Sequence, residues 1–479
     1  MFKRKSLSTF LIAIAFSMEV FAHDKISADL SLTGARIIDV TNGRTLQGKT
    51  VLVRGDSILA VVDQKGLNRY APKRTVNLRG KYLMPGLWDT HVHFGGGAEL
   101  IEENKRLLPL YLAHGITAVR DCAGDLSETV LTWRGQIASG QMQGPTIFTS
   151  GAKLEGYKPL WKGTIEVGTP EEVSAALDKL QGQQVDFVKI TENTMTPAIY
   201  LESLKQVKAR GMASSAHIPV QLTLDQVFAA GLSSIEHQSY LLRTATPEEA
   251  TLTEAVAQGK ITSKEAMKRS LASYDEATAR AAFRRMAAAG TAIVPTLYGS
   301  YVTAYLDQND HSHDAYLQYI GKGLRATYDW RVQRAAQDDA EAIKTRHALF
   351  EKSASLLPLL AQEGVSIIAG TDAGFLNSFD YPGIALHDEI ALYVKYGLTP
   401  AQALQSAIQA GPRLLGKTDR YGSVSENKVA DLLVLNTNPL RNIQATRDIY
   451  LVMSRGKIFD KASLEKMLRD TKNWVANPQ

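Results

Sequence analysis

The chain has 479 residues, 44% of them hydrophobic and 22% charged, which provides ample apolar material for a large globular core. The formal net charge is only +5 and no basic stripe marks a binding surface, so we expect no nucleic-acid partner. Cys122 is the single cysteine, which excludes an intramolecular disulfide.

Residues 1–22 have the pattern of a cleavable signal peptide. Lys3-Arg-Lys5 forms a basic start, and Leu11–Phe16 lies in an apolar stretch that is too short to span a membrane. Val20-Phe-Ala22 fits a signal peptidase site, so we expect cleavage after Ala22 and a periplasmic or secreted protein without a stable membrane anchor. An uncleaved N-terminal anchor is the alternative, and the short apolar stretch argues against it.

Both ends of the mature chain contain short β-rich segments that are separated by tight turns. These segments cover residues 35–40, 50–53, 57–62, 430–435 and 449–453. Neither end has enough strands to close a core alone. We therefore predict one small β-sandwich domain built from residues 23–82 and residues 417–479.

Residues 83–416 alternate short apolar segments with amphipathic helical segments, which is typical of an α/β fold with parallel strands. The expected strands cover residues 83–93, 116–121, 146–151, 187–190, 213–217, 234–237, 292–297 and 366–372. Eight such units predict a (β/α)8 TIM barrel. We interpret the long helical insertions over residues 241–365 as a partial lid or substrate wall. A dimer interface, and hence a homo-oligomer, or plain structural elaboration is equally compatible with them.

Side chains that can bind metals fall at the ends of these expected strands. His91 and His93 end the first strand two residues apart, so both imidazoles point the same way. Four further side chains stand at later strand ends, namely Lys189, His217, His237 and Asp372. The C-terminal strand ends of a TIM barrel converge on one mouth, so we expect all of them to meet there. Each one alone also has an ordinary explanation, such as a core histidine, an ion-paired lysine or a helix cap.

These residues belong to longer motifs that resemble the metal-dependent amidohydrolase superfamily, and within it the imidazolonepropionase-like and prolidase-like branch. The resemblance covers nearly the whole mature chain and is carried by residues 85–93, 115–121, 370–373, 398–403 and 428–435. It implies two divalent metal ions. His91, His93 and Asp372 would hold the more buried ion. His217 and His237 would hold the second.

The resemblance also implies that Lys189 is carboxylated and bridges both metal ions. A lysine ammonium cannot ligate, but burial beside cations favours the neutral amine, which can add CO₂. The expected metal is zinc, although Mn, Co and Ni also suit these ligands. In the implied mechanism a metal-bridging hydroxide attacks the carbonyl, and Asp372 carries the proton to the leaving group. An unmodified Lys189 with a mononuclear site is the alternative.

Four residues are candidates for substrate contacts. Tyr240 and Tyr298, just after strands six and seven, are possible oxyanion donors, and tyrosines at such positions are also common packing residues. Residues 151–162 form a basic loop that contains Tyr157 and Lys158 and could bind a substrate carboxylate. Prolidase-like relatives often carry a Gly-Gly-His segment after strand three, which this chain lacks.

The expected function is that of an exported binuclear amidohydrolase acting on a small molecule, an N-acyl amino acid or a dipeptide-like amide. A lactonase or other ester hydrolase is the alternative, because the same nucleophile attacks such carbonyls. Related deaminases have Glu three residues after the fifth-strand histidine, where this chain has Val220, which disfavours deamination. A non-catalytic metal- or ligand-binding barrel would be expected to have lost ligands, and none is lost.

Overall fold

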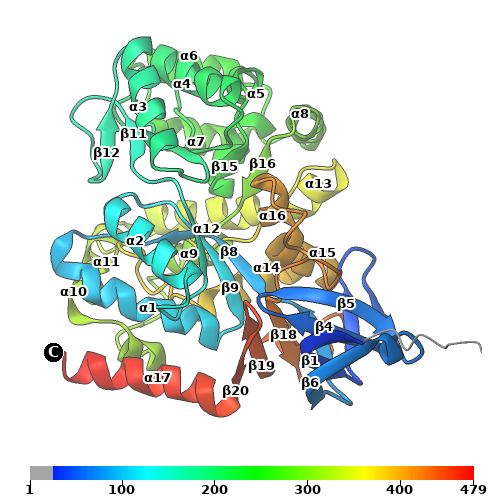
Figure 1. The fold of residues 1–479 in the computed structure, drawn as a ribbon. Helices are drawn as coiled ribbons and strands as arrows, with labels where there is room; N and C mark the ends of the chain where they lie inside the picture. Colours follow the sequence, from blue (N-terminus) through cyan, green and yellow to red (C-terminus); the bar gives the residue numbers. More distant parts are fainter. Residues whose placement is uncertain (1–24, 479) are drawn as a thin grey trace, which may run out of the picture.

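The computed structural model describes residues 25–478 and has a mixed α/β fold (Figure 1). The predicted signal peptide, with its cleavage site after Ala22, lies outside the described residues. Within residues 25–478, no helix combines the length and the hydrophobicity that crossing a membrane requires.

Strands from both ends of the described chain share one six-stranded sheet, with the order β20-β19-β18-β7-β2-β3. In it β18 (Leu432–Leu435) pairs antiparallel with β7 (Tyr82–Pro85), so strands from the two ends of the described chain lie side by side. A four-stranded sheet with the order β5-β4-β1-β6 packs against it, and one hydrophobic cluster joins the two. The remaining bounds are β1 (Ile26–Thr33), β2 (Arg36–Asp39), β3 (Arg44–Leu46), β4 (Lys49–Arg54), β5 (Ser57–Asp63), β6 (Tyr70–Asn77), β19 (Ile449–Ser454) and β20 (Lys457–Asp460).

The middle of the chain forms two sheets of parallel strands that alternate with helices. Their orders are β10-β9-β8-β17 and β12-β11-β13-β14-β15-β16. Most of these strands are buried along their whole length, as is typical of parallel sheets covered by helices. Their bounds are β8 (Leu87–His93), β9 (Ile116–Asp121), β10 (Thr146–Thr149), β11 (Lys153–Glu155), β12 (Thr164–Glu166), β13 (Val188–Ile190), β14 (Ser214–Ala216), β15 (Ser234–Glu236), β16 (Ala292–Val294) and β17 (Ala373–Gly374).

Residues 366–372 connect the two parallel sheets on one side. The Ile293 amide in β16 donates to the Ser366 carbonyl at 2.9 Å, and the Thr90 amide in β8 donates to the Ala369 carbonyl at 3.1 Å. Strands β16 and β8 belong to different sheets, so this segment brings the C-terminal ends of both sheets together.

The strand predicted over residues 116–121 has the predicted bounds, five others are shorter than predicted, and the first and the last differ in kind. One strand was predicted over residues 83–93, but the chain forms β7 and β8, which separate at Gly86. Gly86 packs so tightly on Thr117 that an added Cβ would lie 2.2 Å from the threonine hydroxyl. The last strand was predicted over residues 366–372, but β17 begins at Ala373, because Asp372 has a φ of 74° that interrupts the extended backbone.

Helices cover the parallel strands, and several begin at the expected signals. Thr169 caps α3 in a capping box, with Pro170 in the first turn. The bounds are α1 (Ile101–Ala113), α2 (Ser127–Ala138), α3 (Pro170–Gly182), α4 (Pro197–Ala209), α5 (Leu224–Ala230), α14 (Ile384–Lys395), α15 (Pro400–Gln405), α16 (Gly411–Leu414) and α17 (Lys461–Ala476). The insertions contain α6 (Glu249–Ala257), α7 (Ser263–Ala272), α8 (Glu276–Ala288), α9 (Leu297–Ala304), α10 (Lys322–Ala326), α11 (Asp329–Ala335), α12 (Ala340–Ser355) and α13 (Leu357–Gln362).

Candidate active site

Three of the predicted ligands form a compact cluster at the end of β8. The Nε2 atoms of His91 and His93 lie 3.2 Å apart. Asp372 Oδ1 lies 3.4 Å from His91 Nε2 and 2.9 Å from His93 Nε2. One ligand atom from each residue thus falls within 4.8 Å of the others. Two imidazoles and a carboxylate at this spacing are the ligand types that bind Zn and similar divalent metals.

The other three predicted ligands adjoin this cluster. His217 follows β14 and His237 follows β15, and their Nε2 atoms lie 3.2 Å apart. The ring centroids of His237 and His91 are 5.1 Å apart. Lys189 in β13 is buried, and its Nζ has no hydrogen-bond partner among residues 25–478. An orphaned amine beside two histidine pairs fits a lysine that is carboxylated and bound between two metal ions.

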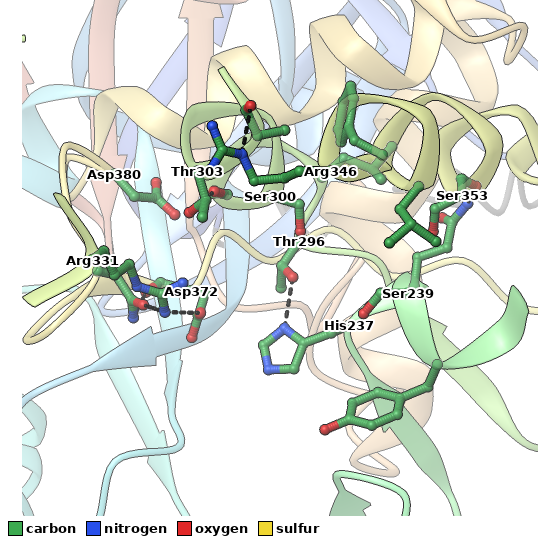
Figure 2. Close-up of a pocket in the computed structure, with 18 of the residues that line it drawn as sticks. His237, Ser239, Thr296, Ser300, Thr303, Arg331, Arg346, Ser353, Asp372 and Asp380 are labelled. Carbon is green, nitrogen blue, oxygen red and sulfur yellow. Dashed lines mark hydrogen bonds and ion pairs between the residues drawn. The ribbon is translucent and has the colours of Figure 1, made fainter. Parts of the chain in front are cut away.

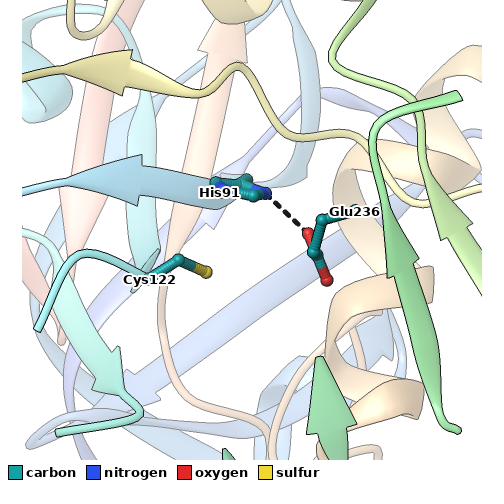
Figure 3. A group of neighbouring side chains, drawn as sticks. All are labelled: His91, Cys122 and Glu236. Atoms are coloured by element: carbon teal, nitrogen blue, oxygen red, sulfur yellow. Dashed lines mark hydrogen bonds and ion pairs between the residues drawn. The ribbon is translucent and has the colours of Figure 1, made fainter. Parts of the chain in front are cut away.

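Three of the histidines are each oriented by a hydrogen bond to a neighbouring side chain. In each case the contact is made at Nδ1, which leaves Nε2 free to face the centre. The contacts join His91 to Glu236 Oε2 at 2.6 Å (Figure 3), His217 to Glu192 Oε2 at 3.0 Å, and His237 to Thr296 Oγ1 at 2.7 Å. The two carboxylates require Nδ1 of His91 and His217 to be the donor, which is the tautomer that leaves Nε2 free to bind a metal. The Thr296 hydroxyl can accept from His237 Nδ1 in the same way.

Cys122 also lies close to His91 and Glu236 (Figure 3), with the ligand atoms of the three residues within 4.8 Å of one another. Glu236 is already paired with Arg120 at 2.8 Å as well as with His91. Burial raises the pKa of the Cys122 thiol to about 12, so it stays protonated. We interpret this group as a support for His91 rather than as a second metal site.

Burial sets the protonation states of the ligands. Desolvation, and after it the charge of Lys189, lowers the pKa of His91 to about 4. Burial likewise holds the pKa of His237 well below its ordinary value. Both imidazoles are therefore neutral near pH 7, which is the ligating form. Burial alone would raise the pKa of Asp372, but the charge interaction and the hydrogen bond with His93 outweigh it, so its pKa is well below the ordinary value.

Three residues of the centre have a left-handed backbone. The φ angles are 74° for His237, 48° for Thr296 and 74° for Asp372. Such conformations cost on the order of 1–3 kcal/mol each in a non-glycine residue and cluster at functional sites. Backbone hydrogen bonds hold them, since the His237 amide donates to Val294 at 2.8 Å and the Asp372 amide donates to His91 at 2.7 Å.

Two cavities meet at the centre. Cavity A has a volume of about 310 Å³ and includes Lys189 in its lining. Cavity B has a volume of about 450 Å³ and includes Thr296 in its lining (Figure 2). Side chains that line both are His237, Arg331, Asp372 and Asn377. Arg331 lies in α11, so the insertions contribute directly to the walls of the centre, as the substrate-wall interpretation predicts. The ring of Trp330 in the same helix lies 6.3 Å from that of Trp161 at the edge of cavity A.

The structure brings one of the four predicted substrate contacts to the centre. Tyr240 lines cavity B, and its hydroxyl donates to Glu192 at 2.8 Å, so this proton is not free for an oxyanion. Tyr298 lines neither cavity, and its amide donates to Glu389 at 2.5 Å.

The basic loop predicted over residues 151–162 reaches the centre through two of its lysines, but not through the two residues predicted as substrate contacts. Tyr157 and Lys158 line neither cavity. Tyr157 is 53% exposed, and its hydroxyl donates to Glu172 at 2.6 Å, near the start of α3. Lys153 and Lys162 of the same loop line cavity A instead.

Sequence analysis missed the residues that support the ligands. Glu236 is buried, stands directly before the predicted ligand His237 and carries a charge in a segment of apolar and small residues. A charge in such a segment is the signal that could have identified Glu236. Glu192 gave no such signal, because it follows its strand in the polar segment Thr191-Glu-Asn-Thr194. Arg331 and Asn377 carried no such signal, because they reach the centre from an insertion and a loop.

The amidohydrolase family model matches residues 82–459 of this chain. The chain belongs to the amidohydrolase family. Ochratoxinase from Aspergillus niger is 22% identical over 507 residues, covering 93% of this chain and 90% of that protein. Adenine deaminase 2 from Desulfotalea psychrophila is 32% identical over 109 residues, which is 23% of this chain and spans 16% of the length of that relative.

Solved structures of family members share the fold. A bottromycin amidohydrolase superposes with a TM-score of 0.72 at 19% identity, covering 93% of this chain and 90% of that one. A Xaa-Pro dipeptidase with bound methionine in the active site superposes with a TM-score of 0.65 at 20% identity, covering 90% and 99%. The family match confirms the predicted superfamily, and the superpositions show that the fold is shared.

Replacing Glu236 by glutamine is expected to weaken both the centre and the fold of this amidohydrolase. Gln keeps the shape but removes the charge that pairs with the buried Arg120, which should cost about 3–5 kcal/mol in unfolding free energy. It also loosens His91, so metal affinity should fall about 10- to 100-fold. Denaturant titration and competition with a chelator measure the two effects.

The matched control for this change is Glu265→Gln, which breaks the exposed pair with Arg269 at 2.8 Å. Exposed pairs contribute little to stability, so this variant should resemble the wild type in both assays. Equal behaviour of the two variants would contradict the supporting role of Glu236.

Proposed function

We propose that the protein is an exported, binuclear metal-dependent amidohydrolase that cleaves the amide bond of an N-acyl amino acid or dipeptide-like substrate. Membership of the amidohydrolase family supports hydrolysis of amide bonds. The observation that carries the binuclear centre is the orphaned Lys189 Nζ next to two histidine pairs whose Nε2 atoms each lie 3.2 Å apart. A mononuclear site would leave this buried amine without a function.

The architecture that goes with this proposal is a (β/α)8 TIM barrel over residues 83–416. Residues 366–372 join the two parallel sheets on one side, and on the other the Asp186 amide donates to the Thr149 carbonyl at 2.9 Å. The two outer sheets would then form a β-sandwich domain from residues 23–82 and 417–479. Their shared hydrophobic cluster supports this division.

The ligand set suggests how the chemistry is divided. When bound, two divalent cations supply Lewis acidity, which polarises a carbonyl and makes water a competent nucleophile near neutral pH. Asp372 is ionised and faces the centre, so its carboxylate can accept the proton of the attacking water and return it to the leaving nitrogen. Zinc is the proposed metal, since the donors are imidazoles and carboxylates.

Export is supported by the sequence of residues 1–22, with cleavage proposed after Ala22. The mature protein would then act on a small molecule in the periplasm or outside the cell, without a stable membrane anchor. N-terminal sequencing of protein recovered from the periplasmic fraction tests this. A start near His23 would support export, and an intact N-terminus in the cytoplasm would contradict it.

Turnover of a panel of N-acyl amino acids and dipeptides by the purified mature protein tests the activity. We expect activity on amides to disappear after treatment with a chelator and to return with Zn, Mn, Co or Ni. Lactones and esters belong in the same panel, because the centre can also attack those carbonyls. If lactones are hydrolysed and no amide is, the protein is a lactonase or other ester hydrolase instead of the proposed amidohydrolase.

A further inference from the structure

Cavity B contains a buried acid that the proposed mechanism does not use. Asp380 lies in the loop between β17 and α14 and has an exposed fraction of 0%. Neither Oδ1 nor Oδ2 has a hydrogen-bond partner among the described residues. Buried carboxyl groups in proteins are almost always paired or hydrogen-bonded, because desolvation of an unpaired one costs several kcal/mol. Since both oxygens of this cavity-lining residue lack a partner, they indicate a ligand that would supply the missing hydrogen bonds.

Asp380 lines cavity B, whose volume of about 450 Å³ is the space available to such a ligand. Figure 2 shows the carboxyl group directed toward the helix that carries Ser300 and Thr303. Gly299 in the same helix allows a close approach, because an added Cβ would lie only 2.7 Å from Asp380 Oδ2. A larger residue in place of Gly299 would therefore collide with the acid.

The surrounding acids make this end of the cavity favourable for a cation. Burial, and then the charges of Asp372, Asp89 and Glu389, raises the pKa of Asp380 well above its ordinary value. A positively charged group would relieve this repulsion and allow the carboxyl to ionise. No such group of the protein makes a hydrogen bond to Asp380 within residues 25–478.

The arginines of cavity B are held by other groups. Arg346 pairs with Asp307 at 2.9 Å. Arg331 donates to the Leu376 carbonyl at 3.1 Å and lies 3.8 Å from Asp372. Arg334 lies over the Trp330 ring, 4.9 Å from its centroid. Asp380 is thus the acid of this cavity whose oxygens are left to pair with substrate.

We propose that Asp380 is the counter-ion for a primary ammonium group of the substrate, so that cavity B selects amides that carry an amine on the part that enters it. The inference rests on the proposed amide hydrolysis and specifies its substrate class. An ammonium is compact and offers three donors, which suits two free carboxylate oxygens in a confined space. Hydrogen bonding to a substrate cation gives strong discrimination, because an analogue without it leaves the buried acid unpaired.

Substrate pairs matched in size but different in charge test this proposal on either side of the amide bond. Nα-acetyl-lysine against N-acetyl-2-aminoheptanoic acid varies the leaving part, and 6-aminohexanoyl-glycine against heptanoyl-glycine varies the acyl part. Within each pair a methyl group replaces the ammonium. We expect kcat/KM of the wild type to favour the amine-bearing member of one pair by at least about tenfold. Asp380→Asn should remove this preference, so that the ratio of kcat/KM between the two members falls to about one.

Asp388→Asn is the matched control, since Asp388 pairs with Arg447 at 2.5 Å and does not line cavity B. It should keep the wild-type preference. Thermal unfolding of both variants establishes that they are folded. Asp380→Glu offers a second variant, which keeps the charge and should keep part of the preference.

The outcomes separate the two proposals. Turnover of amides without any preference in either pair would overturn the cation subsite and leave amide hydrolysis standing. If no amide is turned over, amide hydrolysis fails, and the subsite is then tested by calorimetric binding of hexylammonium and hexanol. Equal affinity of the wild type and Asp380→Asn for hexylammonium would overturn the subsite in that case as well.

Discussion

Lys189→Ala is expected to lower metal content from about two ions per chain to one or fewer and to reduce kcat by at least about 10³-fold. Lys189 is buried and lines cavity A together with histidines of both pairs. Its Nζ has no hydrogen-bond partner in the described chain. Loss of the bridging anion removes the group that holds the two cations together. A metal centre lowers the activation barrier by several kcal/mol, so its loss should slow the reaction strongly. Metal analysis of protein prepared with bicarbonate measures the first effect.

The control for this variant is Lys205→Ala, at an exposed position of α4. It should retain the metal content and kcat of the wild type. One metal ion per chain in the wild type and in Lys189→Ala would contradict the carboxylated lysine and favour a mononuclear centre. Mass spectrometry under native conditions, which detects an added CO₂ on the wild type alone, provides a readout that is independent of activity.

Asp372→Asn is expected to reduce kcat by about 10²- to 10⁴-fold while leaving a folded protein. The substitution keeps the shape of the side chain but removes the negative charge that lies 2.9 Å from His93 Nε2. It therefore removes a ligand charge and the proposed proton carrier together. Steady-state kinetics at saturating metal separates the two, because restored metal content without restored kcat identifies the loss of proton transfer.

The same Asp388→Asn variant controls for the change of an acid to an amide, since it lies outside the centre. A kcat of Asp372→Asn within about tenfold of the wild type, at full metal content, would contradict the proposed proton transfer. The proposed centre would then require another proton carrier.

The ligands of the centre could be predicted because strand geometry is local. His91 and His93 are two residues apart on a buried strand, so their common direction follows from the alternation of side chains. Glu236 could not be predicted in the same way. Alternation along β15 would direct the side chains of Glu236 and His237 to opposite faces of the sheet. His237 lies past the end of the strand, however, and its φ of 74° directs its side chain to the same centre. A single backbone angle therefore determined which residues meet.

Residues that reach the centre from insertions and loops depend on tertiary packing, which no periodicity encodes. Arg331 lies in a long insertion and Asp380 in the loop after the last predicted strand, yet both line cavity B. The prediction for Tyr157 illustrates the reverse case. Its position in a basic loop suggested a substrate contact, whereas its ring packs against Gly168 and its hydroxyl binds Glu172.

The pairing of β7 with β18 has a consequence for how the chain is assembled. Leu83 pairs with Val434, so the N-terminal strand is synthesised long before its partner and must wait for it with an unpaired edge. Exposed strand edges recruit other chains, which makes this interval the step most open to aggregation. Truncation after residue 416 would make that interval permanent, and we expect such fragments to accumulate as insoluble protein even though the candidate active site lies entirely within them.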